Sequence, residues 1–209
     1  MFDAFRDQLT SVAWPVIGAL LVISFLATTT VVFKIVQFAA RGVGRRQAAD
    51  AVLRDWIAGH HDTAAERAAK GKTIRARILA AAMHAMQSHP HDPGFARAEA
   101  TRTALQEMSG LAQYLRILEV AVQAAPMLGL LGTVIGMIDA FSNLSSATGG
   151  IDPALLAGGI WTALVTTALG LGIAIPVYVI SMWLDGRIET EEAEIEAMLS
   201  AFFNRPVPQ

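Results

Sequence analysis

The stretch PALLAGGIWTALVTTALGLGIAIPVYVISMWL, from Pro153 to Leu184, contains no Asp, Glu, Lys or Arg. As a helix it would be roughly 45 Å long, more than the ~30 Å hydrocarbon core of a bilayer requires. Hydroxyl groups and glycines interrupt the apolar run, among them Thr162, Thr166 and Gly170. In a spanning helix such residues usually face other helices or a wet path. The stretch therefore predicts a transmembrane helix with a specialised face.

Two further stretches have the length and composition of membrane spans. Trp14 to Phe33 is an uncharged run, and Val120 to Ile138 contains one glutamine and no charge. The whole chain of 209 residues is 54% hydrophobic, and a soluble domain does not leave that much apolar surface unburied. Cysteine is absent, which excludes disulfides, thiolate metal sites and a cysteine nucleophile.

The basic residues predict the orientation of the three spans. Residues 41–102 carry eleven Arg and Lys against six Asp and Glu, and positive flanks mark the cytoplasmic side. We therefore expect the N-terminus outside and the C-terminus on the cytoplasmic side of the membrane. The expected segments are a periplasmic N-terminus (1–12), a first transmembrane helix (13–40), a cytoplasmic helical loop (41–116), a second transmembrane helix (117–141), a periplasmic loop (142–153), a third transmembrane helix (154–184) and a cytoplasmic C-terminal helix and tail (185–209).

The polar segment between the first two spans is predicted to be helical. Its amphipathic stretches are separated by Gly59, Gly71 and the turn sequence SHPHDPG. After Pro93 the only breaker is Gly110, so we expect one long helix that continues into the second span. The tail beyond the third span has an acidic face, formed by Glu189, Glu192 and Glu196, and an apolar face, formed by Ile188, Ile195 and Leu199.

Catalytic and metal-binding patterns are missing from the sequence. The two histidines of SHPHD flank a proline and cannot share a helical face, and no further ligand has zinc-site spacing. No phosphate-binding loop or nucleophile elbow occurs. We therefore expect no enzyme activity, no metal and no cofactor. The middle of each span also lacks any acid, and threonine hydroxyls can only relay or orient water.

The sequences LEVAVQAAPMLGLLGTVIGMIDAF (118–141) and DPALLAGGIWTALVTTALGLGIAIPVYV (152–179) closely resemble the MotA/TolQ/ExbB proton channel family, most of all its ExbB and then its TolQ members. This resemblance implies an all-α integral membrane protein of the bacterial inner (cytoplasmic) membrane. It further implies three transmembrane helices with long cytoplasmic extensions, assembled as a ring that resembles a homopentamer around the helices of a single-span ExbD- or TolR-like partner. The partner supplies a transmembrane aspartate.

The resemblance also implies roles for individual residues. Thr133 and Thr167 match the pore-lining threonines of the second and third spans. Thr162 stands where many relatives have a glutamate, so it is a weaker candidate for the proton pathway. The residues expected to pack or kink the helices are Pro126, Gly129, Gly132, Gly136 and Gly170. We expect the glycine- and threonine-bearing second and third spans to form the inner wall of the ring, and the first span to face lipid.

The implied function is that of a stator subunit, which uses proton-motive force to drive TonB-dependent transport through a TonB-like or TolA-like protein. A TolQ-like role in the Tol-Pal envelope system remains an alternative. A non-conducting structural scaffold is a second alternative, because Thr162 cannot titrate where relatives carry a glutamate.

Overall fold

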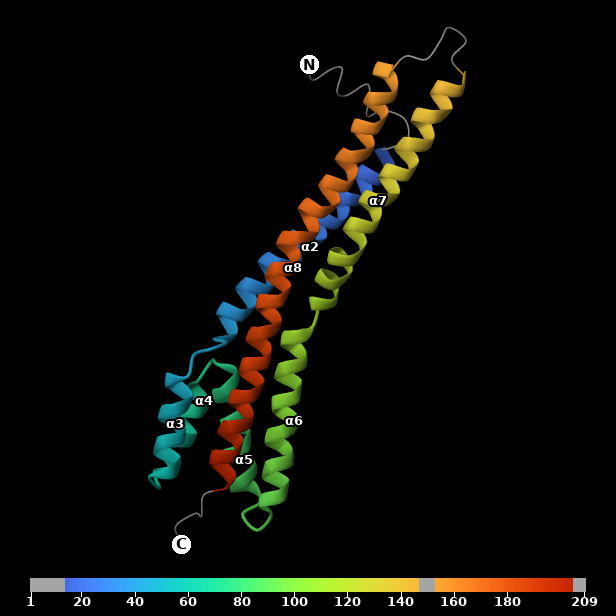
Figure 1. The fold of residues 1–209 in the computed structure, drawn as a ribbon. Helices are drawn as coiled ribbons and strands as arrows, with labels where there is room; N and C mark the ends of the chain where they lie inside the picture. Colours follow the sequence, from blue (N-terminus) through green and yellow to red (C-terminus); the bar gives the residue numbers. More distant parts are fainter. Residues whose placement is uncertain (1–13, 147–152, 205–209) are drawn as a thin grey trace. The chain divides into compact units, whose positions relative to one another are not determined.

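A computed structural model describes residues 14–146 and 153–204, and about 90% of these residues are helical, with no strand among them (Figure 1). The expectation of an all-α fold is confirmed. The helices are α2 (Trp14–Arg41), α3 (Gln47–Ile57), α4 (His61–Lys70), α5 (Ile74–Ser88), α6 (Pro93–Ala112), α7 (Leu115–Ser146) and α8 (Pro153–Phe203).

Three helical segments are long and apolar enough to cross a membrane: Trp14–Arg41, Pro93–Ser145 and Leu156–Phe203. Each of them overlaps one of the three spans that the sequence predicts. Within the expected outer loop 142–153, helix α7 continues to Ser146 before the described residues end. Residues 147–152 of that loop, the expected N-terminal segment 1–12 and residues 205–209 lie outside the described residues, and Pro153 is the first residue of α8.

The chain forms two compact units, and helices α2 and α8 contribute to both. The first unit comprises the described residues of Met1–Val32 together with Tyr114–Met182. The second unit comprises Phe33–Gln113 and the described residues of Trp183–Gln209.

The core of the first unit joins α2, α7 and α8. Val16 and Leu20 of α2 are buried with Ala125 of α7 and Ala174 of α8. Alanine at two of these positions lets the helices approach closely. Small residues are common where helices pack in a membrane, because no hydrophobic driving force acts between helices in lipid and close packing holds them together. Large side chains on the outer surface of this unit are exposed, with Phe25 at 72% and Met127 at 70%. These surfaces suit lipid or other protein chains rather than water.

The second unit contains the short helices that the sequence predicts between the first two spans. Thr73 caps the N-terminus of α5, and its hydroxyl accepts a hydrogen bond from the Ala76 amide at 3.3 Å. Asp92 caps the N-terminus of α6 in the same way, with its carboxylate accepting from the Phe95 amide at 3.0 Å. Such N-terminal caps satisfy amides that the first helical turn leaves free. Helices α5 and α6 lie side by side after the turn at His89–Asp92 (Figure 1).

The expectation of one unbroken helix from Pro93 into the second span is wrong. Helix α6 ends at Ala112, and α7 begins at Leu115. Between them Tyr114 has φ of +69°, the only positive value at a non-glycine residue in the described part of the chain. Gly110, the sole breaker in the sequence, lies inside α6.

The part of α8 beyond Leu184 continues without interruption to Phe203, and its two predicted faces are present. Ile195 is 3% exposed, whereas Glu189, Glu192 and Glu196 are all exposed. The apolar face therefore packs inside the second unit, and the acidic face points away from it.

Candidate functional site

The predicted site residues lie on α7 and α8 of the first unit, where the two helices are in close contact. Gly129 is buried, and a Cβ atom at this position would lie 2.8 Å from the Thr166 carbonyl oxygen and 2.9 Å from the Thr167 Cα. At Gly132 the same added atom would lie 2.5 Å from the Thr166 Oγ1. The first two glycines of the predicted packing set thus bring the α7 backbone directly onto the threonine pair of α8.

The close contact continues in both directions along the helices. A Cβ at Gly136 would lie 3.0 Å from the Ala163 Cβ. At the other end Gly170 of α8 faces the Ala125 carbonyl, which would clash with any added Cβ. Small residues at these positions give two helices a continuous backbone-to-backbone contact. Four of the predicted packing residues therefore act in one contact.

We expect Gly129→Ala to destabilise the first unit by about 1 to 3 kcal/mol, the usual cost of overpacking. The added methyl group meets backbone atoms of α8, which cannot rotate away as a side chain could. Thermal unfolding in detergent measures the change. Gly172→Ala is the matched control, because a Cβ there meets nothing within 4 Å. Equal melting of the two variants would contradict the packing role.

Thr166 is a structural member of the contact that the predicted site set did not include. Its side chain is fully buried, and its hydroxyl lies 3.1 Å from the Gly129 carbonyl and 2.7 Å from the Ala163 carbonyl. A buried hydroxyl that finds such acceptors holds neighbouring helices together. The spacing of Thr162 and Thr166 on one face was visible in the sequence, but a helix-to-helix hydrogen bond cannot be read from spacing on one helix.

Thr167, a predicted proton-pathway residue, differs from its neighbour. Its Oγ1 is buried, yet it has no hydrogen-bond partner among the described residues. Buried hydroxyl groups are rarely left unpaired, because desolvation without a bond costs free energy. Such an exception calls for an explanation, and a water or an incoming polar group is the usual one.

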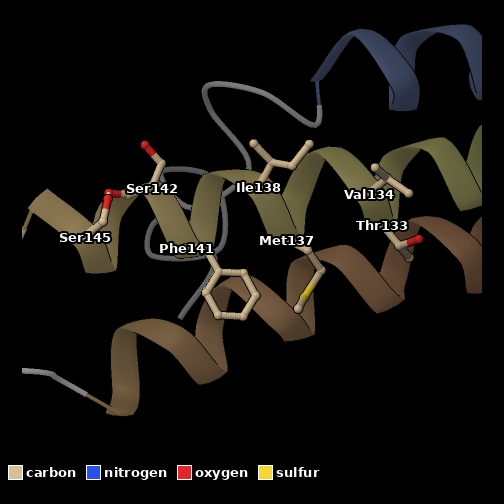
Figure 2. Close-up of a pocket in the computed structure, with 7 residues that line it drawn as sticks. All are labelled: Thr133, Val134, Met137, Ile138, Phe141, Ser142 and Ser145. Carbon is tan, nitrogen blue, oxygen red and sulfur yellow. The ribbon is translucent and has the colours of Figure 1, made fainter.

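Thr133, the second predicted pathway residue, lines an open groove along α7 with Val134, Met137, Ile138, Phe141, Ser142 and Ser145 (Figure 2). Its hydroxyl donates to the Leu130 carbonyl of its own helix at 2.6 Å. The groove is mostly apolar and carries hydroxyl groups at Thr133, Ser142 and Ser145. This surface suits another helix that brings a polar group to the level of Thr133.

The weaker candidate, Thr162, bonds within its own helix. Its hydroxyl donates to the Gly158 carbonyl at 3.0 Å, a back-bond that satisfies it locally. Pro126 lies inside α7, where it removes one backbone hydrogen bond from the helix. It directly follows Ala125, whose carbonyl faces Gly170.

The arrangement can orient water or a hydrogen-bonded group, but it cannot by itself carry a proton across a membrane. Hydroxyls donate and accept hydrogen bonds without ionising near neutral pH. Between Val120 and Ile138, and between Pro153 and Leu184, the sequence has no carboxylate, imidazole or cationic side chain. No group of His, Asp and Glu suited to a metal occurs among the described residues.

Comparison with known proteins identifies a family that fits closely packed helices with hydroxyl groups and no titratable residue between them. The MotA/TolQ/ExbB proton channel family matches residues 70–197, which is more than half of the chain and includes both α7 and the spanning part of α8. The chain belongs to this family. Its members are proton channel proteins, and the match together with the three apolar helices supports a multi-pass membrane protein.

Several relatives carry ExbB names. A putative biopolymer transport protein ExbB homolog of Methanothermobacter thermautotrophicus is 42% identical over 95 residues, covering 46% of this chain and 33% of the relative. The biopolymer transport protein exbB1 of Vibrio cholerae is 44% identical over 75 residues, covering 34% and 33%. A putative biopolymer transport protein ExbB-like 1 of Synechocystis is 37% identical over 134 residues, covering 60% and 51%. The matches thus span between a third and about half of the length of these relatives.

Proposed function

We propose that this chain is the proton-channel stator subunit of an inner-membrane complex that drives TonB-dependent transport with an ExbD- or TolR-like partner. The observation that carries the proposal is the buried, unpartnered Thr167 hydroxyl at the α7–α8 contact, within the region of the family match. The ExbB names of the relatives favour a TonB-type role over a TolQ-like one.

The partner is needed because the spans of this chain contain no titratable group in their middle. A transmembrane aspartate from a single-span partner would supply that group, and Thr133 and Thr167 would hold water or accept and donate hydrogen bonds beside it. One charge that crosses 100 mV releases ~2.3 kcal/mol, so several protons provide enough free energy to move a partner protein. A TonB-like or TolA-like protein would then receive that motion.

We further propose a homo-oligomer, with five copies as the family resemblance implies, in which α7 and α8 form the inner wall and α2 contacts lipid. The N-terminus would be periplasmic and the segment 41–116 cytoplasmic, as the basic residues after the first span favour. Labelling with membrane-impermeant maleimide tests this orientation. A cysteine at the exposed Ser145 should react from the periplasm, and one at Ser88 should be protected; the opposite result would reverse the topology.

Reconstitution tests the proposed function directly. The chain is co-expressed with a single-span partner that carries a transmembrane Asp, and the purified complex is placed in liposomes with a pH-sensitive dye inside. We expect proton flux from the complex, and none from either protein alone or from a partner with Asp→Asn. A complex that assembles without conducting would overturn the channel and leave the structural scaffold. Restoration of Tol-Pal function instead of TonB-dependent uptake in cells would assign the TolQ-like role.

A further inference from the structure

Helical structure is interrupted between α6 and α7, although the helix propensity of the residues there predicts no interruption. Residues from Leu111 to Leu118 contain neither proline nor glycine, and Leu, Ala, Gln and Arg among them favour helix. Yet Tyr114 adopts φ of +69°, a left-handed conformation in which its Cβ is disfavoured. A bulky residue remains in this region only where surrounding contacts determine it.

Those contacts come from the last turns of α2. The Lys34 ammonium donates to the Leu111 carbonyl at 2.7 Å and to the Gln37 Oε1 at 2.8 Å. The Gln37 side chain in turn donates to the Gly110 carbonyl at 3.1 Å. In a continuous α-helix the carbonyls of Gly110 and Leu111 would accept from the amides four residues later, at Tyr114 and Leu115. The two side chains of α2 therefore occupy acceptors that continuation of the helix would use.

Lys34 is a buried cation whose charge is compensated by carbonyl groups. Its side chain is 0% exposed, and no carboxylate pairs with it among the described residues. The nearby Glu107 pairs instead with Arg41 at 3.7 Å and with Arg77 at 3.1 Å. A buried cation without an acid is costly unless other groups solvate it. The C-terminal carbonyls of α6, at the negative end of its dipole, fill that role here.

We propose that Lys34 and Gln37 form a conformational switch, which holds the Pro93–Ser146 segment interrupted while they are engaged and makes Gln113 and Tyr114 helical when they disengage. In the second state the carbonyls of Gly110 and Leu111 return to the helix, and Tyr114 loses its disfavoured conformation. Removal of that penalty favours the continuous helix by roughly tenfold. This proposal concerns backbone conformation and is independent of the proposed proton path.

The chain offers a direct measurement, because it has only two tyrosines. Selective 13C labelling of tyrosine gives signals from Tyr114 and from Tyr178, which lies inside α8 and serves as the helical reference. In the unmodified protein we expect one left-handed and one helical Cα shift, with Tyr178→Phe assigning them. In Lys34→Met, which keeps an apolar stem of similar size but no donor, the Tyr114 signal should move to the helical position.

The controls separate the switch from general damage. Lys70→Met removes a lysine whose side chain is 75% exposed on α4, and it should leave both signals unchanged. Gln37→Leu removes the bond to Gly110 and the Gln37 acceptor of Lys34 but leaves the Lys34 bond to Leu111, so it should give a mixture of left-handed and helical Tyr114. If Lys34→Met does not fold, the helical Tyr178 signal is lost, and the Tyr114 signal of Gln37→Leu then tests the proposal. A Tyr114 signal that stays fully left-handed in the folded variants overturns the proposal.

Discussion

Thr167→Val is expected to leave the protein folded and bound to its partner while it abolishes transport driven by proton-motive force. Valine has nearly the shape of threonine, and the hydroxyl it lacks makes no hydrogen bond to the described residues. Removal of an unpaired buried polar group is neutral or stabilising, because its desolvation cost disappears. Thermal unfolding in detergent should therefore be unchanged or slightly raised. Uptake in cells, proton flux in liposomes and partner co-purification complete the measurement.

Three other threonines, Thr30, Thr133 and Thr162, give controls with different expected outcomes. Thr30→Val in α2 removes only a back-bond to the Leu26 carbonyl at 2.8 Å, so transport should persist. Thr133→Val should reduce transport less than Thr167→Val, and Thr162→Val should matter less again, since the Thr162 hydroxyl is satisfied by Gly158. Full transport in Thr167→Val would remove this residue from the pathway. Loss of the complex would make it a packing residue.

The sequence was sufficient to predict an all-α fold with three helices long and apolar enough to span a membrane, because these features depend on local composition. An uncharged run such as Trp14 to Phe33 has few alternatives to a spanning helix. Glycines spaced four apart, as at Gly132 and Gly136, indicate which face of a span meets another helix. Both inferences use residues close together in the chain.

The interruption at Tyr114 and the division of labour between adjacent threonines could not be predicted in this way. The break depends on Lys34, which is 77 residues away from its acceptor at Leu111. From the local sequence alone, a lysine that follows an apolar run is predicted to lie at the membrane surface. Likewise Thr166 and Thr167 are adjacent residues of the same type, so the sequence does not distinguish them. The structure shows that the Thr166 hydroxyl bonds to the Gly129 carbonyl, whereas the Thr167 Oγ1 has no partner among the described residues.

A buried charge cluster in the second unit was equally hidden, although its residues are ordinary in the sequence. Glu191 of α8 is 2% exposed, and Arg75 of α5 donates to its two carboxylate oxygens at 2.7 and 2.9 Å. The Gly44 amide donates to Glu191 at 2.8 Å, while Glu194 pairs with Arg75 and Arg46. The cluster attaches the part of α8 that belongs to the second unit to the turn that follows α2.

Glu191→Gln is expected to destabilise the second unit by about 3 to 5 kcal/mol, because it leaves the Arg75 guanidinium buried with only part of its compensating charge. Glu192→Gln is the matched control, since this adjacent carboxylate is exposed and its loss should change stability by no more than about 0.5 kcal/mol. Thermal unfolding in detergent and tryptic cleavage at the exposed Arg187 report on the attachment of α8.

The double variant Arg75→Met/Glu191→Leu separates the net value of the ion pair from the cost of breaking it. Replacing both charges with apolar side chains of similar size is often neutral, because two desolvation penalties disappear together. Here Gly44 and Glu194 would still lose their partner atoms, so we expect the double variant to recover part of the stability lost in Glu191→Gln. Melting of Glu191→Gln at the temperature of Glu192→Gln would show instead that the cluster does not hold α8 in place.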